Sequence, residues 1–347
     1  MMKHRGLFVL TLFLFAVAGI GLAGLFGTDS GEGDRNEQSG GSEAAGEGDG
    51  EIVVVDSVRY LILDDRSVHL FTYSAAAAEL FADALNRFKA AADPGVNVYC
   101  LLAPTSAEFV ESRKYREMSD SQKAAFARVD GMLDPGIVRI DAYGALEKHR
   151  DDYLYFRTDH HWTALGAYYA YDRFMQAIDD EPVALEEYAA GVIEGFLGSD
   201  FKATSSEKLK ANPDAISYYA PLREYVYTAY STKDQPLDRR VVDPKYAGEE
   251  AGFYAVFLGG DFPWGKIETG NRNGKRIVVV KDSYANAFIP FLLPHFETVY
   301  YIDPRTFKGN LNDFAKEREI TDVLFLYSST AARTTSVGSF LNAIQEH

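Results

Sequence analysis

The sequence predicts an α/β protein, a three-layer α/β/α sandwich in which a mostly parallel sheet is covered by helices on both faces, preceded by an N-terminal transmembrane helix. Three observations lead to this prediction. Short apolar runs rich in Val and Ile alternate with helical patterns along most of the chain. The 347 residues are 47% hydrophobic, which is enough for a sizeable core. Near the N-terminus, 22 consecutive residues carry no charge.

The uncharged segment runs from Gly6 to Gly27 and is long enough to cross a hydrocarbon core. Lys3 and Arg5 precede it, so the positive-inside rule places the N-terminus in the cytoplasm. We expect residues 1–27 to be a signal anchor, although Ala16-Val-Ala18 also resembles a signal-peptide cleavage site. Both interpretations place the rest of the chain outside the cytoplasmic membrane.

Composition divides the remainder into a linker and a globular domain. Residues 28–51 are rich in Gly, Ser and Glu and lack aromatic side chains, which predicts a disordered acidic tether. Residues 52–347 form the expected catalytic domain. The net charge of −16 argues against nucleic-acid binding, because phosphate recognition requires a basic face. Cys100 is the only cysteine, so no intrachain disulfide can form and a buried thiol is expected.

The first half of the domain predicts alternating strands and helices. The residue types that support this are β-branched residues in the strands and apolar residues at helical spacing in the helices. In chain order we expect an extended segment at 53–63, a helix at 74–92, a buried strand at 96–103, a helix at 119–132, a strand at 137–140, a helix at 142–148 and a helix at 163–178.

The region 180–270 fits this alternation poorly, since it is rich in Tyr and Gly and has short mixed runs. We expect a peripheral insertion there, which is a candidate for substrate recognition. The alternation then resumes. The expected elements are a strand at 277–280, a helix from 284, a strand at 299–302, a helix at 311–319, a strand at 323–327 and a C-terminal helix.

Two segments carry side chains suited to nucleophilic catalysis. The first is Tyr155-Phe-Arg-Thr-Asp-His-His-Trp162, which contains Asp159 and His161. The second is Lys281-Asp-Ser-Tyr-Ala-Asn-Ala-Phe288, where Ser283 follows a strand and begins a helix. A serine needs an imidazole to take its proton and a carboxylate to orient that imidazole. Open parallel sheets place ligands beyond the carboxyl ends of their strands, which is where Ser283 is expected.

Each segment alone has an ordinary structural interpretation. A serine after a strand is usually a helix cap, and a histidine pair beside a tryptophan is more often structural than catalytic. Together, the two segments favour an acyl-transfer site. The backbone N–H of Ser283 or Tyr284 would then lie near a developing oxyanion.

The two segments resemble the DHHW protein family, which is related to the SGNH-hydrolase-like O-acetyltransferases that include the periplasmic alginate acetylation proteins. The resemblance is carried by Thr158-Asp-His-His-Trp162 and Lys281-Asp-Ser-Tyr-Ala-Asn286, and it extends from Val53 to the C-terminus. It implies an SGNH-like fold with Ser283 as nucleophile, His161 as general base and Asp159 as its orienter. His160 falls at the variable position of the pattern.

The sequence also departs from the usual SGNH pattern. Lys281 stands where a typical SGNH esterase has the glycine of Gly-Asp-Ser. The usual oxyanion-hole Gly and Asn have no clear counterparts. Asn286 and Gly260, the latter within Leu258-Gly-Gly-Asp-Phe-Pro263, are the candidates, with Tyr284 and Trp162 as further residues expected beside the substrate.

The resemblance implies a membrane-anchored, extracytoplasmic O-acetyltransferase that modifies a cell-wall or extracellular polysaccharide. Its partner would be a membrane-bound O-acyltransferase that supplies acetyl groups, and no cofactor is expected. An acetyl esterase of the same fold and a non-catalytic polysaccharide-binding or assembly protein are the alternatives. The Asp-His-His string also occurs in metal-dependent phosphoesterases, but their further Asp motifs and Gly-rich histidine segment are missing from this sequence, so we expect no metal site.

Overall fold

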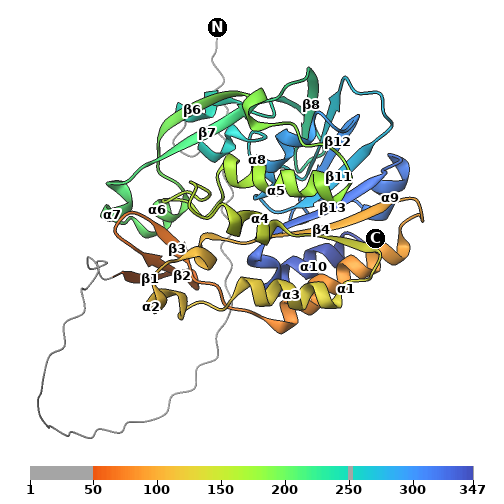
Figure 1. The fold of residues 1–347 in the computed structure, drawn as a ribbon. Coiled ribbons are helices and arrows are strands. Elements are labelled where there is room, and N and C mark those ends of the chain that lie inside the picture. Colours follow the sequence, from red (N-terminus) through yellow and green to blue (C-terminus); the bar gives the residue numbers. More distant parts are fainter. Residues whose placement is uncertain (1–49, 249–252, 347) are drawn as a thin grey trace, which may run out of the picture.

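An eight-stranded mixed sheet forms the centre of the computed structural model, which describes residues 50–248 and 253–346 (Figure 1). Five neighbouring strands are parallel, and three further strands add to them in antiparallel fashion. The strand order is β5 (Ile137–Ile140), β4 (Asn97–Ala103), β13 (Asp322–Ser328), β11 (Arg276–Lys281), β12 (Thr298–Ile302), β10 (Trp264–Thr269), β8 (Tyr225–Tyr230) and β9 (Pro236–Arg239). The parallel half was expected, but the whole sheet is mixed.

Helices cover both faces of this sheet, because its central strands are apolar on both sides (Figure 1). Along β11, Val278 and Val280 pack on one face while Ile277 and Val279 pack on the other. The first face carries α1 (Ala75–Ala91), α3 (Gln122–Met132), α9 (Leu311–Glu317) and α10 (Thr335–Ala343). The second face carries α4 (Ala142–Lys148), α5 (Ala164–Ala177) and α8 (Ala285–Phe288).

The register of the parallel strands brings three loops to one edge of the sheet. Lys281 at the end of β11 pairs with Leu326 of β13, and Ser328 at the end of β13 pairs with Ala103 at the end of β4. The segments that follow β4, β11 and β13 therefore begin side by side.

The region 180–270 contributes both to the main sheet and to a separate one. Strands β8, β9 and β10 extend the main sheet, whereas β6 (Ala189–Phe196) and β7 (Asp214–Ala220) pair only with each other. Two short helices, α6 (Ser199–Thr204) and α7 (Glu207–Lys210), connect β6 to β7. This region also supplies the loop that reaches Asp159, described below.

A small antiparallel sheet of β1 (Glu51–Val55), β2 (Val58–Ile62) and β3 (Ser67–His69) precedes the sandwich. The extended segment expected at 53–63 is therefore two strands joined by a turn, in which Asp56 and Ser57 have positive φ angles of 48° and 66°. Helix α2 (Arg113–Arg116) lies between β4 and α3 in the chain. Cys100 is a free, buried thiol, and burial raises its pKa.

Within residues 50–248 and 253–346, no helix has the length and apolar character needed to cross a membrane. The predicted anchor at 1–27 and nearly all of the predicted linker at 28–51 lie outside these residues.

Candidate active site

The Asp-His-His segment is a tight loop closed by its own backbone. Tyr155 and Trp162 form an isolated antiparallel bridge, and the N–H of Phe156 donates to the carbonyl of His161. Asp214 of β7 accepts from the backbone N–H of Thr158 at 2.8 Å, which fixes the loop from outside. These bonds hold the backbone between the bridge residues in one shape.

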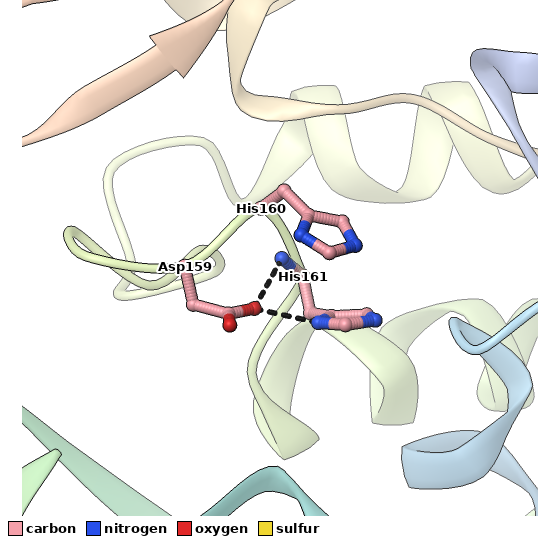
Figure 2. Close-up of side chains that lie close together, drawn as sticks. All are labelled: Asp159, His160 and His161. Carbon is pink, nitrogen blue, oxygen red and sulfur yellow. Dashed lines mark hydrogen bonds and ion pairs between the residues drawn. The ribbon is translucent and has the colours of Figure 1, made fainter. Parts of the chain in front are cut away.

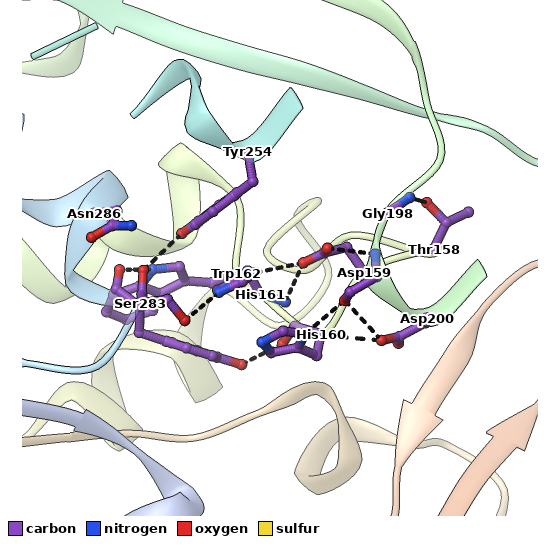
Figure 3. Close-up of polar contacts among 12 residues, drawn as sticks. Thr158, Asp159, His160, His161, Trp162, Gly198, Asp200, Tyr254, Ser283 and Asn286 are labelled. Carbon is purple, nitrogen blue, oxygen red and sulfur yellow. Dashed lines mark hydrogen bonds and ion pairs between the residues drawn. The ribbon is translucent and has the colours of Figure 1, made fainter. Parts of the chain in front are cut away.

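Asp159, His161 and Ser283 form a continuous hydrogen-bonded chain; Figure 2 shows the bonds between Asp159 and His161, and Figure 3 includes Ser283. Asp159 Oδ1 accepts from the backbone N–H of His161 at 2.9 Å and lies 2.6 Å from its Nδ1. His161 Nε2 lies 2.7 Å from Ser283 Oγ. Because an ionised carboxylate can only accept, Nδ1 carries the imidazole proton and Nε2 is left to accept the serine proton.

The second oxygen of Asp159 is fixed by the first residue of α6. The N–H of Ser199 donates to Asp159 Oδ2 at 2.9 Å. Burial alone would raise the pKa of Asp159, but His161 and the hydrogen bonds outweigh burial and lower that pKa. Asp159 is therefore a carboxylate at neutral pH.

Gly198 packs directly against Asp159 (Figure 3), since a Cβ at residue 198 would lie only 2.3 Å from the Asp159 Cβ. No motif marks Gly198 or Ser199, which lie about 40 residues from Asp159 along the chain.

Ser283 lies on the turn from β11 into α8, as expected. The turn is held by Asp282, whose carboxylate accepts from the N–H of Tyr284 at 3.0 Å and from the N–H of Ser328 at 2.9 Å. The N–H of Tyr284 is therefore already bonded to the Asp282 carboxylate. Asp282 also links the turn to the end of β13.

Trp162 and Tyr284 brace the two segments against each other. Trp162 Nε1 donates to the carbonyl of Tyr284 at 2.8 Å, and the Tyr284 hydroxyl donates to the carbonyl of His160 at 2.6 Å. Trp162 is completely buried. The structure thus places Trp162 in the interior, where its indole links the Asp-His-His loop to the turn that carries Ser283.

Asn286 and Gly260 lie at a charged cluster beside the turn that carries Ser283. Asp261 Oδ1 accepts from Asn286 Nδ2 at 3.0 Å and from the fully buried Lys281 Nζ at 2.9 Å, while Arg305 donates to Asp261 Oδ2 at 2.8 Å. Burial raises the pKa of Asp261, but Lys281 and Arg305 outweigh it and hold that pKa low. Gly260 has a positive φ of 109°, and its N–H donates within its own turn. Gly260 therefore shapes the loop that presents Asp261.

Lys281 at the position of the missing glycine thus has a structural role. Its ammonium ties the end of β11 to Asp261, so the turn is anchored by charge.

Tyr254 was not expected in the site. Its ring stacks on His161 with centroids 3.9 Å apart and planes 11° apart, and its hydroxyl lies 3.5 Å from the carbonyl oxygen of Ser283 (Figure 3). The chain has 22 tyrosines, and nothing in the sequence distinguishes this one.

His160 lies beside the hydrogen-bonded chain without being part of it. Its Nδ1 lies 2.8 Å from Ser199 Oγ, and its ring lies 3.9 Å from that of His161, centroid to centroid. Desolvation and the neighbouring imidazole lower the pKa of His160, so its ring is neutral at pH 7. It lines a cavity of about 230 Å³ together with Ser283.

Asp159, His160 and His161 also bring three potential metal ligands within 4.8 Å of one another (Figure 2). Two ligands of one tetrahedral zinc ion would lie roughly 3.4 Å apart, given metal–ligand bonds of about 2.1 Å. The 2.6 Å between Asp159 and His161 is shorter and fits a hydrogen bond. The other nitrogen of His161 is bonded to Ser283, so the observed arrangement favours proton transfer over metal binding.

A model of the DHHW protein family matches residues 32–302, which is more than three quarters of the chain. The chain belongs to the DHHW protein family. A DHHW family protein from Eubacterium siraeum has a crystal structure that is 32% identical in sequence, with a TM-score of 0.77, over 86% of this chain and 99% of the other. The resemblance noted in the sequence is thereby confirmed.

A more distant solved structure shares the fold of this DHHW protein. PatB1 from Bacillus cereus is 21% identical with a TM-score of 0.67, over 82% of this chain and 98% of PatB1. A second PatB1 structure, described as carrying a sulfonyl adduct, is 20% identical with a TM-score of 0.66, over 83% of this chain and 97% of PatB1. A comparison with curated protein sequences gave no match.

Proposed function

We propose that this DHHW protein is an O-acetyltransferase that uses Ser283, His161 and Asp159 to move an acetyl group onto a polysaccharide hydroxyl. The observation that carries the proposal is the unbroken chain of hydrogen bonds from Asp159 through His161 to Ser283. The helices on both faces of the sheet and the place of Ser283 beyond β11 support an SGNH-hydrolase-like classification.

In the first half-reaction, Ser283 Oγ attacks the acetyl carbonyl carbon while His161 Nε2 takes the hydroxyl proton. The tetrahedral intermediate expels the donor alcohol, which receives that proton from His161. Acetyl-Ser283 remains. In the second half-reaction, the acceptor hydroxyl gives its proton to His161 and attacks the same carbon, so that Ser283 leaves and recovers its proton.

Asp159 supports both half-reactions through His161. It accepts the Nδ1 proton and stabilises the imidazolium that forms when Nε2 is protonated. The lowered pKa of Asp159 favours this role, because the carboxylate stays ionised throughout. With water as the acceptor the same residues would hydrolyse the acetyl ester, which makes an esterase the second candidate.

The acetyl group, the polysaccharide and the cellular setting come into the proposal from the family resemblance and from the N-terminal sequence. We propose that residues 1–27 anchor the protein, that residues 28–51 hold the domain away from the bilayer, and that a membrane-bound O-acyltransferase supplies acetyl groups on the extracytoplasmic side.

Mass spectrometry of the full-length protein after incubation with a chromogenic acetyl ester tests the proposal. We expect an adduct of about 42 Da on Ser283, as one acetyl group requires, and its loss in Ser283→Ala. Ser336→Ala is the matched control, because Ser336 lines the same cavity without contacting His161. Full ester turnover by a folded Ser283→Ala variant would refute the assignment.

A further inference from the structure

A row of cavities follows the edge of the sheet on which Ser283 lies. The Ser283 cavity of about 230 Å³ shares His160, Tyr284, Ser328 and Thr330 with a narrow cavity of about 40 Å³. The narrow cavity in turn shares Ser106 with one of about 370 Å³. These three cavities therefore adjoin one another on one side of Ser283.

On the other side of Ser283, the loop after β12 lines both the Ser283 cavity and a fourth cavity. Pro304 and Arg305, which follow β12, line the Ser283 cavity. The next residues, 306–310, line a cavity of about 440 Å³ that also contains Trp264. The row thus has its two largest cavities at its ends and Ser283 near its middle.

The sheet explains why the cavities form a row. Ser106 follows β4, Ser328 ends β13, Ser283 follows β11 and Pro304 follows β12, and these four strands are neighbours in that order. Neighbouring strands lie about 4.8 Å apart, so the loops after β4 and β12 are about 14 Å from each other. The row is longer than one small ligand requires.

We propose that this row is a binding groove for a linear glycan chain without carboxylate or phosphate groups, with an internal sugar at Ser283. The inference rests on the proposed function, since it takes the acceptor hydroxyl to be that of a sugar. The groove would bind several sugar units on both sides of the sugar that reacts. The acceptor glycan would be uncharged or carry amines.

The side chains at both ends of the row suit a sugar chain. Phe109 and Tyr153 line the 370 Å³ cavity, and Trp264 and Phe307 line the 440 Å³ cavity. The indole of Trp264 is held in place by stacking on Tyr230, with centroids 3.6 Å apart, and by a hydrogen bond to Asp234. Aromatic side chains beside hydrogen-bonding groups match the mixed apolar and hydroxylated surface of a sugar.

The charges that line the end cavities favour a glycan without anionic groups. Acidic side chains outnumber basic ones in both. The larger of the two is lined by Asp234, Asp313 and Glu317 with Lys308 and Arg318. The other is lined by Asp64, Asp65, Glu111 and Asp152 with Arg66 and Arg150.

Between the end cavities, Arg333 lines the narrow cavity, where no carboxylate is among the lining residues, whereas the two cations beside Ser283 are paired. Lys281 is bonded to Asp261, and Arg305 is bonded to Asp261 and Asp303. A polyanionic chain would meet unfavourable potential at both ends of the groove, whereas an uncharged or amine-bearing chain would not.

Calorimetry on full-length Ser283→Ala tests the groove without relying on catalysis. The probes are oligomers of one to six units of glucose, N-acetylglucosamine or glucosamine, compared with galacturonate oligomers of equal length. We expect at least one uncharged or amine-bearing series to gain tenfold or more in affinity from monomer to tetramer, and galacturonate to bind at least tenfold more weakly. Equal affinity of monomer and tetramer in every series, or tightest binding of galacturonate, would overturn the proposal.

Charge reversal provides the second test. In Glu111→Lys/Glu317→Lys, galacturonate tetramers should bind about fivefold more tightly at low salt, because one added cation lies in each end cavity. Glu79→Lys/Asp83→Lys makes the same change in net charge on α1, away from the row, and should leave galacturonate affinity unchanged. An equal gain in both double variants would contradict a local effect.

The outcomes separate the groove from the chemistry. If wild-type ester turnover depends on Ser283 but glycan length has no effect on binding, the groove fails and the acyl-enzyme stands. If Ser283→Ala keeps full turnover while the length dependence holds, the acyl-enzyme fails and the groove stands.

Discussion

Gly198→Ala is expected to lower activity by displacing Asp159, although Gly198 contacts neither His161 nor Ser283. The φ of −84° at Gly198 is accessible to any residue, so the effect of a methyl group there is steric. The new Cβ would lie 2.3 Å from the Asp159 Cβ and 2.6 Å from its Oδ2. Carbon atoms pack at about 3.5 Å or more, so Asp159 or the loop must give way by about 1.2 Å.

Asp159 Oδ1 and His161 Nδ1 lie 2.6 Å apart in the wild-type site. When Asp159 takes up a shift of about 1.2 Å away from His161, this separation exceeds the range of a hydrogen bond. Misplacement by about 1 Å in a catalytic array typically costs 100-fold in rate, which is about 2.7 kcal/mol of transition-state stabilisation. We therefore expect kcat for acetyl-ester hydrolysis to fall about 100-fold.

The assay is steady-state hydrolysis of a chromogenic acetyl ester, with thermal unfolding as the check on folding. Gly95→Ala is the matched control, since no atom lies within 4 Å of a Cβ at that exposed position. The low-field proton resonance of His161 Nδ1–H gives a second readout, which should be present in wild type and lost in Gly198→Ala. A folded Gly198→Ala variant with kcat within threefold of wild type would refute the reasoning.

Three further predictions concern the surroundings of the site. Lys281→Met should lower the free energy of unfolding by about 2–3 kcal/mol in denaturant titrations. This is somewhat below the cost of breaking a fully buried ion pair, because Asp261 is partly exposed. An unchanged denaturation midpoint would contradict a stabilising role for the Lys281–Asp261 ion pair. Tyr254→Ala should reduce kcat about tenfold by removing the ring stacked on His161, whereas Tyr254→Phe should stay within threefold; equal losses would assign the effect to the hydroxyl. The pKa values of Asp159 and Asp261 are lowered on folding, so their contribution to stability is present above the ordinary Asp pKa of about 4 and is lost as the pH falls further. Thermal unfolding measured from pH 7 to pH 3 should show Tm falling below about pH 4, and a Tm that rises on acidification would argue against paired carboxylates.

The parallel half of the fold was predictable because its strands are buried on both faces and read as continuous apolar runs. The strand expected at 277–280 is β11, Arg276–Lys281, and the helix expected at 163–178 is α5, Ala164–Ala177. The antiparallel half gave no such signal. In β8, Tyr225–Tyr230, only Tyr227 and Ala229 are buried and Val226 is exposed, so the strand is not buried on both faces as the central strands are.

The candidate site was predictable where the chemistry lies in short motifs. Asp159, His161 and Ser283 were expected and lie within hydrogen-bond distance. The residues that hold them were less predictable, because their contacts depend on how distant loops meet. Tyr254 and Gly198 reach the site only through the packing of the region 180–270, and no local pattern marks them.

The two halves of the hydrogen-bonded chain are 122 positions apart, with the imidazole on one segment and the hydroxyl on another. Neither half has reactivity by itself, since an isolated serine hydroxyl is a poor nucleophile. Because Ser283 follows β11, which lies between β12 and β13, the proposed chemistry requires that these strands have paired. On the proposed mechanism, ester turnover during refolding would therefore count only molecules in which Asp159, His161 and Ser283 have come together.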